Sequence, residues 1–291
     1  MSLAVIANPL AGRGRGKKVG EEVRAQLASK NADFEFIFTT RSREAIELAH
    51  KAAEKHEIVC ALGGDGTIGE VLEGVYNTKS SLGIIPAGTG NDYARGLGIP
   101  RDYNKALETI LNPRFTKMDV GLESDKVFGV LASVGFPVSV IDYVNRHRDG
   151  LLRGSPAILV ATFQTIRLLP IHHVKITIDG KSFETSTIGV FLMNMPYGGG
   201  GLKFAPEARY DDGKFTILVI NEISKPRLLW TLPRVYFGKH VNNPACSFYE
   251  GREVTIESDL VLPKMFDGDL RSSTPMNAKL MPKAVSVVVP K

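Results

Sequence analysis

Cysteine and long hydrophobic runs are both scarce in this sequence. The 291 residues include two cysteines, Cys60 and Cys246, which cannot form a disulfide framework, so we expect a reducing compartment. The most apolar uncharged run, residues 128–141, contains glycine and proline and is shorter than the roughly 20 residues of a membrane-spanning helix. No secretory signal is visible. We therefore expect a protein that can visit a membrane surface without crossing the membrane.

Three common signatures of nucleotide or nucleic-acid binding are also missing. The glycine- and arginine-rich loop 10–18 has alanine at position 11 and lysine at 18, where a P-loop needs glycine and Ser or Thr. A dinucleotide fingerprint that starts at Gly12 would need glycine in place of Lys17. The net charge of +5 suits anionic partners such as ATP and lipid headgroups. Without a basic-aromatic array, it does not indicate nucleic acid.

The order of apolar patterns predicts two domains. Up to residue 114, short apolar runs alternate with helical patterns, which predicts a parallel sheet covered on both faces. The following half has an Asp-Gly hairpin signal at 179–180 and several short strands, which predicts an antiparallel β-sandwich with helices near 140–148, 151–169 and 225–238. We expect an α/β nucleotide-binding domain at 1–114, a β-sandwich substrate domain at 115–291 whose final strand can return to the first domain, and a site in the cleft between them.

The stretch with the clearest chemical character is the apolar run 57–62 followed by GGDGT at 63–67. It predicts a strand, a tight glycine loop and a helix start, whose free N–H groups suit a phosphate. Asp65 would repel that phosphate, so its presence makes sense if it holds Mg²⁺ or orients a nucleophile. The alternative is a glycine turn in which Asp65 only caps the helix.

A second strand ends in a loop of the same kind, PAGTGNDYAR at 86–95, with Asn91 suited to cap the next helix. The pair of loops at this spacing resembles the diacylglycerol kinase catalytic-domain family, in its bacterial soluble lipid kinase branch. The Asn-Pro-x-x-Gly segment at 8–12 and the segment 194–215 extend the resemblance into both halves. It implies a Rossmann-like first domain, related to those of NAD kinases and phosphofructokinases, and a β-sandwich second domain.

The resemblance also implies an ATP site at the carboxyl ends of the first-domain strands. Thr40 is predicted to contact ATP only because of this resemblance, since a threonine at the end of a strand is common. Lys17 and Arg95 would offset the charge that develops on the phosphates, and Asp65 would act in catalysis near Mg²⁺. The residues expected to contact the nucleotide are Asn8, Pro9, Leu10, Ala11, Gly12, Lys17, Thr40, Gly64, Asp65, Gly66, Thr67, Glu70, Thr89, Asn91 and Arg95.

Two further sites are implied in the second half. A structural Mg²⁺ would bind the Asp212 side chain and the carbonyls of Arg209 and Lys214, although an ordinary acidic turn is the alternative. At 267–269 the sequence reads Asp-Gly-Asp, where the family has Asp-Gly-Glu with the Glu proposed as the base. Asp269 would then deprotonate the lipid hydroxyl from a shorter side chain. The alternatives are a plain turn, or transfer of the role to Asp65.

These observations predict an ATP- and Mg²⁺-dependent kinase that phosphorylates a lipid alcohol, with diacylglycerol leading. A soluble-substrate kinase of the NAD kinase or phosphofructokinase type, and a non-catalytic nucleotide- or lipid-binding regulator, remain alternatives. We expect a cytoplasmic protein in transient contact with the inner face of the membrane. An exposed strand edge would allow a homodimer, but nothing in the sequence requires one.

Overall fold

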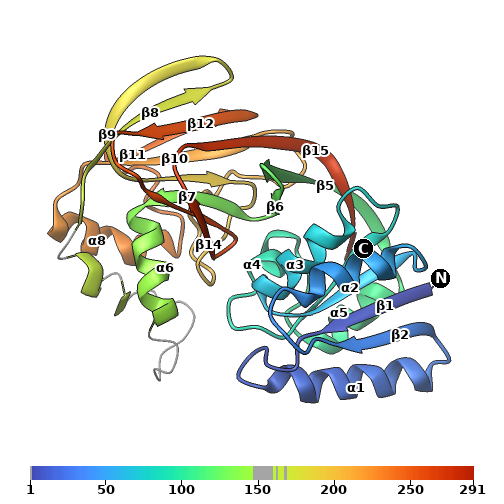
Figure 1. Ribbon diagram of the computed structural model, residues 1–291. Helices are drawn as coiled ribbons and strands as arrows, with labels where there is room; N and C mark the ends of the chain where they lie inside the picture. Colours follow the sequence, from blue (N-terminus) through green and yellow to red (C-terminus); the bar gives the residue numbers. More distant parts are fainter. Residues whose placement is uncertain (1, 147–159, 162, 167–168) are drawn as a thin grey trace. The chain divides into compact units, whose positions relative to one another are not determined.

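The computed structural model describes residues 2–146, 160–161, 163–166 and 169–291 (Figure 1). The chain divides into two compact units, Met1–Val120 with Pro282–Lys291 (unit 1), and Gly121–Met281 (unit 2). The helix expected over 151–169 lies mostly outside the described residues and stays a prediction.

Unit 1 alternates strands and helices as its sequence pattern predicts. β5 (Arg114–Glu123) leads out of the unit, and the end of β15 (Met276–Val289) returns to it. The elements between are β1 (Ser2–Ala7), α1 (Arg15–Ser29), β2 (Asp33–Phe38), α2 (Glu44–Ala53), β3 (Ile58–Gly63), α3 (Asp65–Val75), β4 (Ser81–Pro86), α4 (Asp92–Gly96) and α5 (Tyr103–Leu111).

The sheet of unit 1 is parallel, in the order β2-β1-β3-β4, with the end of β15 beside β4. Helices α1 and α5 bury one face through Val23 and Leu107, among others. Helices α2 and α3 cover the other face, packed so closely that a Cβ at Gly74 would lie 2.4 Å from the Ile46 carbonyl oxygen. Because the strands are parallel, the loops that follow β1, β3 and β4 open at one edge of the sheet.

Unit 2 is an antiparallel β-sandwich, which confirms the predicted fold class. One layer holds β13, β7, β9, β10 and β11, and the other holds β8, β12 and the start of β15. β9 pairs with β8 through its first half and with β7 through its second, so it joins the layers. The strands are β6 (Lys126–Phe128), β7 (Leu131–Gly135), β8 (His172–Ile178), β9 (Lys181–Met193), β10 (Phe215–Asn221), β11 (Cys246–Gly251), β12 (Glu253–Ser258), β13 (Pro263–Phe266) and β14 (Asp269–Ser273).

The core of the sandwich lies between these layers. Val190 and Phe215 face Ile176 and Ile256 across it, all fully buried. The Phe128 and Phe215 rings stack with centroids 5.7 Å apart. Alternation along each strand sends every second side chain into this core, as the sequence pattern predicts.

A smaller apolar cluster binds helices to the outer side of β9. It joins α6 (Phe136–Arg146), residues 160–161 and 163–166, and α8 (Lys225–Val235) through Phe136, Ala161, Ile188 and Leu228 (Figure 1). The helices expected near 140–148 and 225–238 correspond to α6, which begins four residues earlier at Phe136, and α8. No helix in the described part of the chain is both long and apolar enough to span a membrane.

Candidate active site

The loops after β1, β3 and β4 contact one another at the carboxyl edge of the unit 1 sheet. Gly12 has a φ of +57°, and a Cβ there would lie 2.3 Å from the Ala87 carbonyl oxygen. A Cβ at Gly88 would lie 2.5 Å from the Gly64 Cα. These distances exclude any side chain, so the backbones can meet only because the sequence places glycine at both points. The fold thus brings together the three phosphate-facing segments that the sequence predicted.

Side chains tie these loops into one structure. Asn8 donates from Nδ2 to the Thr67 hydroxyl at 3.1 Å, and its Oδ1 accepts the Leu10 N–H at 2.9 Å. The first loop is therefore held against the start of α3. Pro9 and Ala11 lie in the same loop: the Pro9 carbonyl accepts the Lys17 N–H at 3.1 Å, and the Ala11 N–H donates to the Asn8 carbonyl at 3.2 Å.

The second glycine loop is closed from within by Asn91. Asn91 is at the N-cap position of α4, as predicted, but its side chain does not cap the helix. It bonds instead to Gly88, accepting the backbone N–H at 3.0 Å and donating to the carbonyl at 3.1 Å. Arg95 donates from Nε to the Gly90 carbonyl at 3.2 Å. Both side chains shape the loop around Thr89, which is itself exposed.

Asp65 connects the two glycine loops. It is the first residue of α3, and Gly64 rather than Asp65 is the N-cap residue. The Asp65 carboxylate accepts the backbone N–H of Tyr93, in the first turn of α4, at 3.2 Å. Burial, and then the negative charge of Asp92, raise the pKa of the Asp65 carboxyl to about 7. Asp65 is thus not a simple helix cap, and sequence reasoning missed its acidic neighbour Asp92.

The chemistry of this edge fits a magnesium-bound phosphate chain. Asp65 and Asp92 are neighbouring carboxyl groups, a hard-oxygen pair that a divalent cation would stabilise. Among the described residues no group of three His, Cys, Asp or Glu side chains forms a metal site, so phosphate and water oxygens would have to complete the shell. A Cβ at Gly66 would meet no heavy atom of the described residues within 4 Å, and its φ is not positive. The fold itself therefore does not require glycine at position 66.

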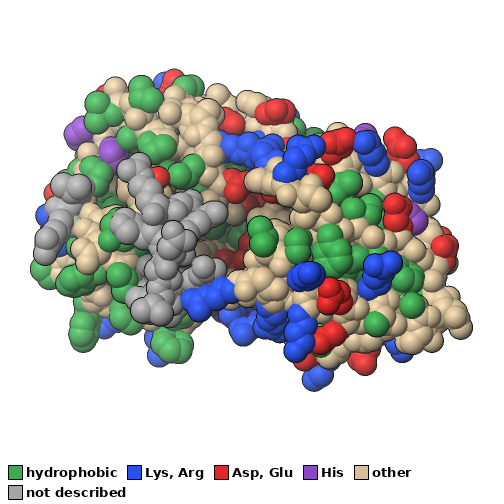
Figure 2. Space-filling view, turned by 60° about the horizontal axis from the view of Figure 1, so that its bottom comes forward, with side chains coloured by type: hydrophobic (Ala, Val, Ile, Leu, Met, Phe, Trp, Pro, Cys, Tyr) green, Lys and Arg blue, Asp and Glu red, His purple; other side chains and the backbone are tan. Residues whose placement is uncertain are grey.

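The remaining predicted nucleotide contacts lie around these loops. Thr40 is bound to Glu44 through both its backbone N–H and its hydroxyl, and these bonds lower the pKa of Glu44. Glu70 accepts the Arg43 N–H at 3.2 Å. Lys17 is exposed in the first turn of α1, because the helix begins at Arg15 rather than after residue 18 as expected. Figure 2 shows Lys and Arg side chains gathered on the face where α1 begins.

The Asp-Gly-Asp turn of unit 2 joins β13 to β14, and Asp267 anchors it. The Asp267 carboxylate accepts three backbone N–H groups, from Gly129 at 2.8 Å and from Val130 and Leu131 at 2.9 Å. Asp269 begins β14 with its side chain 46% exposed, 3.6 Å from Arg271. The first aspartate thus fixes the turn, whereas the second is half-exposed at the start of β14, a division of roles that the sequence did not reveal.

The loop expected to bind a structural metal is held by its own contacts. Asp212 is exposed and accepts the Lys214 N–H at 3.3 Å, and Asp211 lies 3.3 Å from Arg209. Arg252 donates to the Gly213 carbonyl at 2.9 Å. A cation here would depend on one carboxylate and backbone carbonyls, and its binding stays a prediction.

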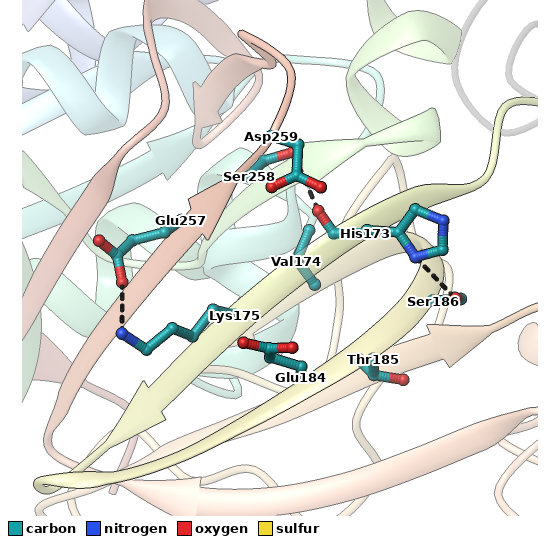
Figure 3. A pocket seen from close by; sticks show the side chains of 9 residues that line it. All are labelled: His173, Val174, Lys175, Glu184, Thr185, Ser186, Glu257, Ser258 and Asp259. Carbon is teal, nitrogen blue, oxygen red and sulfur yellow. Dashed lines mark hydrogen bonds and ion pairs between the residues drawn. The ribbon is translucent and has the colours of Figure 1, made fainter.

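A pocket of about 720 Å³ lies elsewhere in unit 2, on strands β8, β9 and β12 (Figure 3). Its lining is polar and internally paired: His173 bonds to Ser186 at 3.0 Å, and Lys175 lies 3.3 Å from Glu257. None of the predicted site residues lines it.

Comparisons with known proteins identify the family of this chain. A family model described as the diacylglycerol kinase catalytic domain matches residues 2–122, and one described as the YegS C-terminal NAD kinase beta sandwich-like domain matches residues 130–289. A diacylglycerol kinase of Staphylococcus carnosus is 26% identical over 99% of this chain and 94% of its own. One of Staphylococcus aureus is 26% identical over 98% and 91%.

A crystal structure of a diacylglycerol kinase from Bacillus anthracis has the same fold, with a TM-score of 0.82, 24% identity, and coverage of 99% of this chain and 96% of that one. The two matched models together span nearly the whole sequence and include both glycine loops and the Asp-Gly-Asp turn. The chain therefore belongs to the diacylglycerol kinase catalytic-domain family with a YegS-type C-terminal domain, and it is an ATP-dependent kinase.

Proposed function

We propose that this kinase transfers the γ-phosphoryl group of Mg²⁺-ATP to the hydroxyl of a lipid alcohol, and that diacylglycerol, which yields phosphatidic acid, is the leading acceptor. The observation that carries the proposal is the contact of three glycine-containing loops around Asp65, with exposed Gly66 where a side chain would obstruct phosphate. The curated relatives named diacylglycerol kinases support the choice of acceptor.

The residues of unit 1 would bind and orient the nucleotide. Backbone N–H groups of Gly64, Gly66 and Thr67 at the start of α3 suit phosphate oxygens. Asp65 and Asp92 would hold the Mg²⁺, which neutralises charge on the phosphates when bound. Lys17 is an exposed cation that can approach the transferred group.

Asp269 of unit 2 would accept the proton of the lipid hydroxyl. The hydroxyl oxygen then bonds to the γ-phosphorus, the bond from that phosphorus to the β–γ bridging oxygen breaks, and ADP leaves. Asp269 is one methylene shorter than glutamate. The three hydrogen bonds of Asp267 hold its backbone in place, which reduces the cost of the shorter reach.

The test is transfer of labelled γ-phosphate from Mg²⁺-ATP into diacylglycerol, phosphatidylglycerol and a sphingoid base in mixed micelles. We expect labelled phosphatidic acid with the wild type and none with Asp65→Asn. Asp269→Asn should bind ATP normally and lose turnover. A labelled soluble alcohol with no labelled lipid would favour the soluble-substrate alternative. ATP binding without any transfer would favour a regulator.

A further inference from the structure

Helix α8 carries exposed aromatic side chains that the sandwich core does not use. Leu228, Thr231 and Val235 are buried against unit 2, whereas Trp230 is 69% exposed. The chain turns back after the helix, because the Phe237 N–H donates to the Arg234 carbonyl at 3.1 Å, and Phe237 is 75% exposed. Two large rings therefore face solvent at one end of unit 2, where burial would stabilise them.

The charged residues of α8 and the segment that follows it are all cationic. From residue 223 to residue 249 the sequence has four Lys and Arg residues and no Asp or Glu. All four cations are exposed. The Arg234 guanidinium lies 5.3 Å from the centre of the Trp230 ring, so charge and aromatic surface are adjacent. We call this the α8 surface: Lys225, Arg227, Trp230, Arg234, Phe237 and Lys239.

We infer that the α8 surface docks the enzyme on an anionic lipid bilayer, with Trp230 and Phe237 entering the headgroup region. Cations beside Trp and Phe on a helix that lies along a protein surface are the composition of an interfacial membrane-binding helix. A second copy is a poor occupant, because a two-fold contact would set this positive surface against itself. An acidic polypeptide would satisfy the cations but gives no reason for two exposed rings.

This inference rests on the proposed function for its purpose, since a lipid acceptor resides in a membrane. It adds the surface through which the enzyme reaches that membrane. The docking itself requires neither ATP nor turnover, so it can be measured separately.

The chain provides its own reporter, because Trp230 is its single tryptophan. The full chain would be titrated with vesicles of phosphatidylcholine alone, and of an equal mixture with phosphatidylglycerol. We expect the emission of Trp230 to shift to the blue, and to be quenched by lipid brominated in the upper acyl chain, only with the anionic vesicles. The affinity should fall steeply with added salt.

Matched variants separate this surface from general charge. Arg227→Gln with Arg234→Gln should weaken vesicle affinity about 25-fold, since each cation near an anionic surface contributes about fivefold. Lys175→Gln with Lys181→Gln removes two cations from the β8–β9 hairpin, which Figure 1 shows away from α8, and should leave affinity unchanged. All four side chains are exposed, so melting temperatures should match the wild type.

Several outcomes would overturn the inference. One is an emission of Trp230 that does not shift with anionic vesicles, and another is equal binding to both vesicle types. A third is an equal loss of vesicle affinity in the two double variants. The last is an emission shift that is produced without vesicles, by raising the protein concentration or by adding polyglutamate. Phosphorylation of a dispersed short-chain diacylglycerol distinguishes the two proposals. Activity without vesicle docking contradicts only the α8 surface, and docking without lipid phosphorylation contradicts only the proposed function.

Discussion

The backbone N–H of Tyr93 donates to the Asp65 carboxylate across 3.2 Å, and this hydrogen bond helps to join the two glycine loops of unit 1. It sets the carboxylate of the first loop against the first turn of the helix that follows the second. The ionised Asp65 carboxylate lowers the stability of the folded protein, because it is buried and lies near the negative charge of Asp92. Such a cost is typical of groups retained for a ligand.

Asp65→Asn should stabilise the protein at alkaline pH while it abolishes activity. The folded-state pKa of about 7 lies above the ordinary value of 3.8, so the folded protein binds more protons in that window and loses stability as pH rises through it. Asparagine does not ionise, so the variant should be more stable by up to about 4 kcal/mol at pH 8 and nearly equal to wild type near pH 4. Thermal melts across this range measure the difference. Exposed Asp125→Asn is the control, and parallel curves for wild type and Asp65→Asn would contradict the prediction.

Gly66→Ala and Gly88→Ala should separate binding from folding. Alanine at Gly88 would set its Cβ 2.5 Å from the Gly64 Cα, which should cost about 1–3 kcal/mol of stability. Alanine at Gly66 has open space in the second position of α3 and should leave stability equal or up to about 1 kcal/mol higher. It should nevertheless weaken ATP binding about tenfold or more, the equivalent of about 1.4 kcal/mol. Calorimetric titration with ATP decides, and unchanged affinity would place Gly66 away from the phosphates.

Asp267→Asn should lower stability, whereas Asp269→Asn should abolish activity and leave stability nearly unchanged. An amide at 267 places an N–H₂ group among three backbone N–H donors, which should cost about 2 kcal/mol of stability and displace the turn. Asp269→Asn changes a half-exposed side chain, so stability should stay within about 0.5 kcal/mol while lipid phosphorylation is lost. Urea unfolding and the labelled-lipid assay measure both effects. Equal destabilisation by the two variants would refute this division of roles.

Removing one partner of the buried ion pair in unit 2 should destabilise the protein more than replacing both partners. Lys264 lies 2.5 Å from Glu123 with side chains only 5% and 7% exposed. Lys264→Met leaves the glutamate buried without its partner and should cost about 3–5 kcal/mol, whereas Lys264→Met with Glu123→Met should recover most of it. Urea unfolding measures these energies. The exposed pair Lys214–Glu250, at 2.7 Å, is the matched control, and Lys214→Met should cost at most about 1 kcal/mol. A double variant no more stable than Lys264→Met would contradict this account.

The local patterns of the sequence determined the elements and the loops of this protein. Apolar runs that end in glycine predicted β3 and β4, and alternation predicted the sandwich strands, because each depends on residues a few positions apart. The glycines at 64 and 88 lie where the two loops approach closely, and the approach of a ligand to them stays a prediction. The start of α1 was predicted too late, after the loop 10–18, whereas Gly14 at a φ of +85° ends the loop and the helix begins at Arg15.

The tertiary structure alone decided what those loops touch. Asp65 meets a backbone N–H 28 residues away, and Asp267 holds a segment more than 130 residues earlier in the chain. Thr40 hydrogen-bonds to Glu44, although the sequence predicted a nucleotide contact for it. Asn91 hydrogen-bonds to Gly88, although the sequence predicted that it would cap α4. Such partners follow from how strands and helices pack, and packing depends on the whole chain rather than on any window of it. The sequence therefore predicted which groups are candidates for chemistry, and the fold determined their partners and exposure.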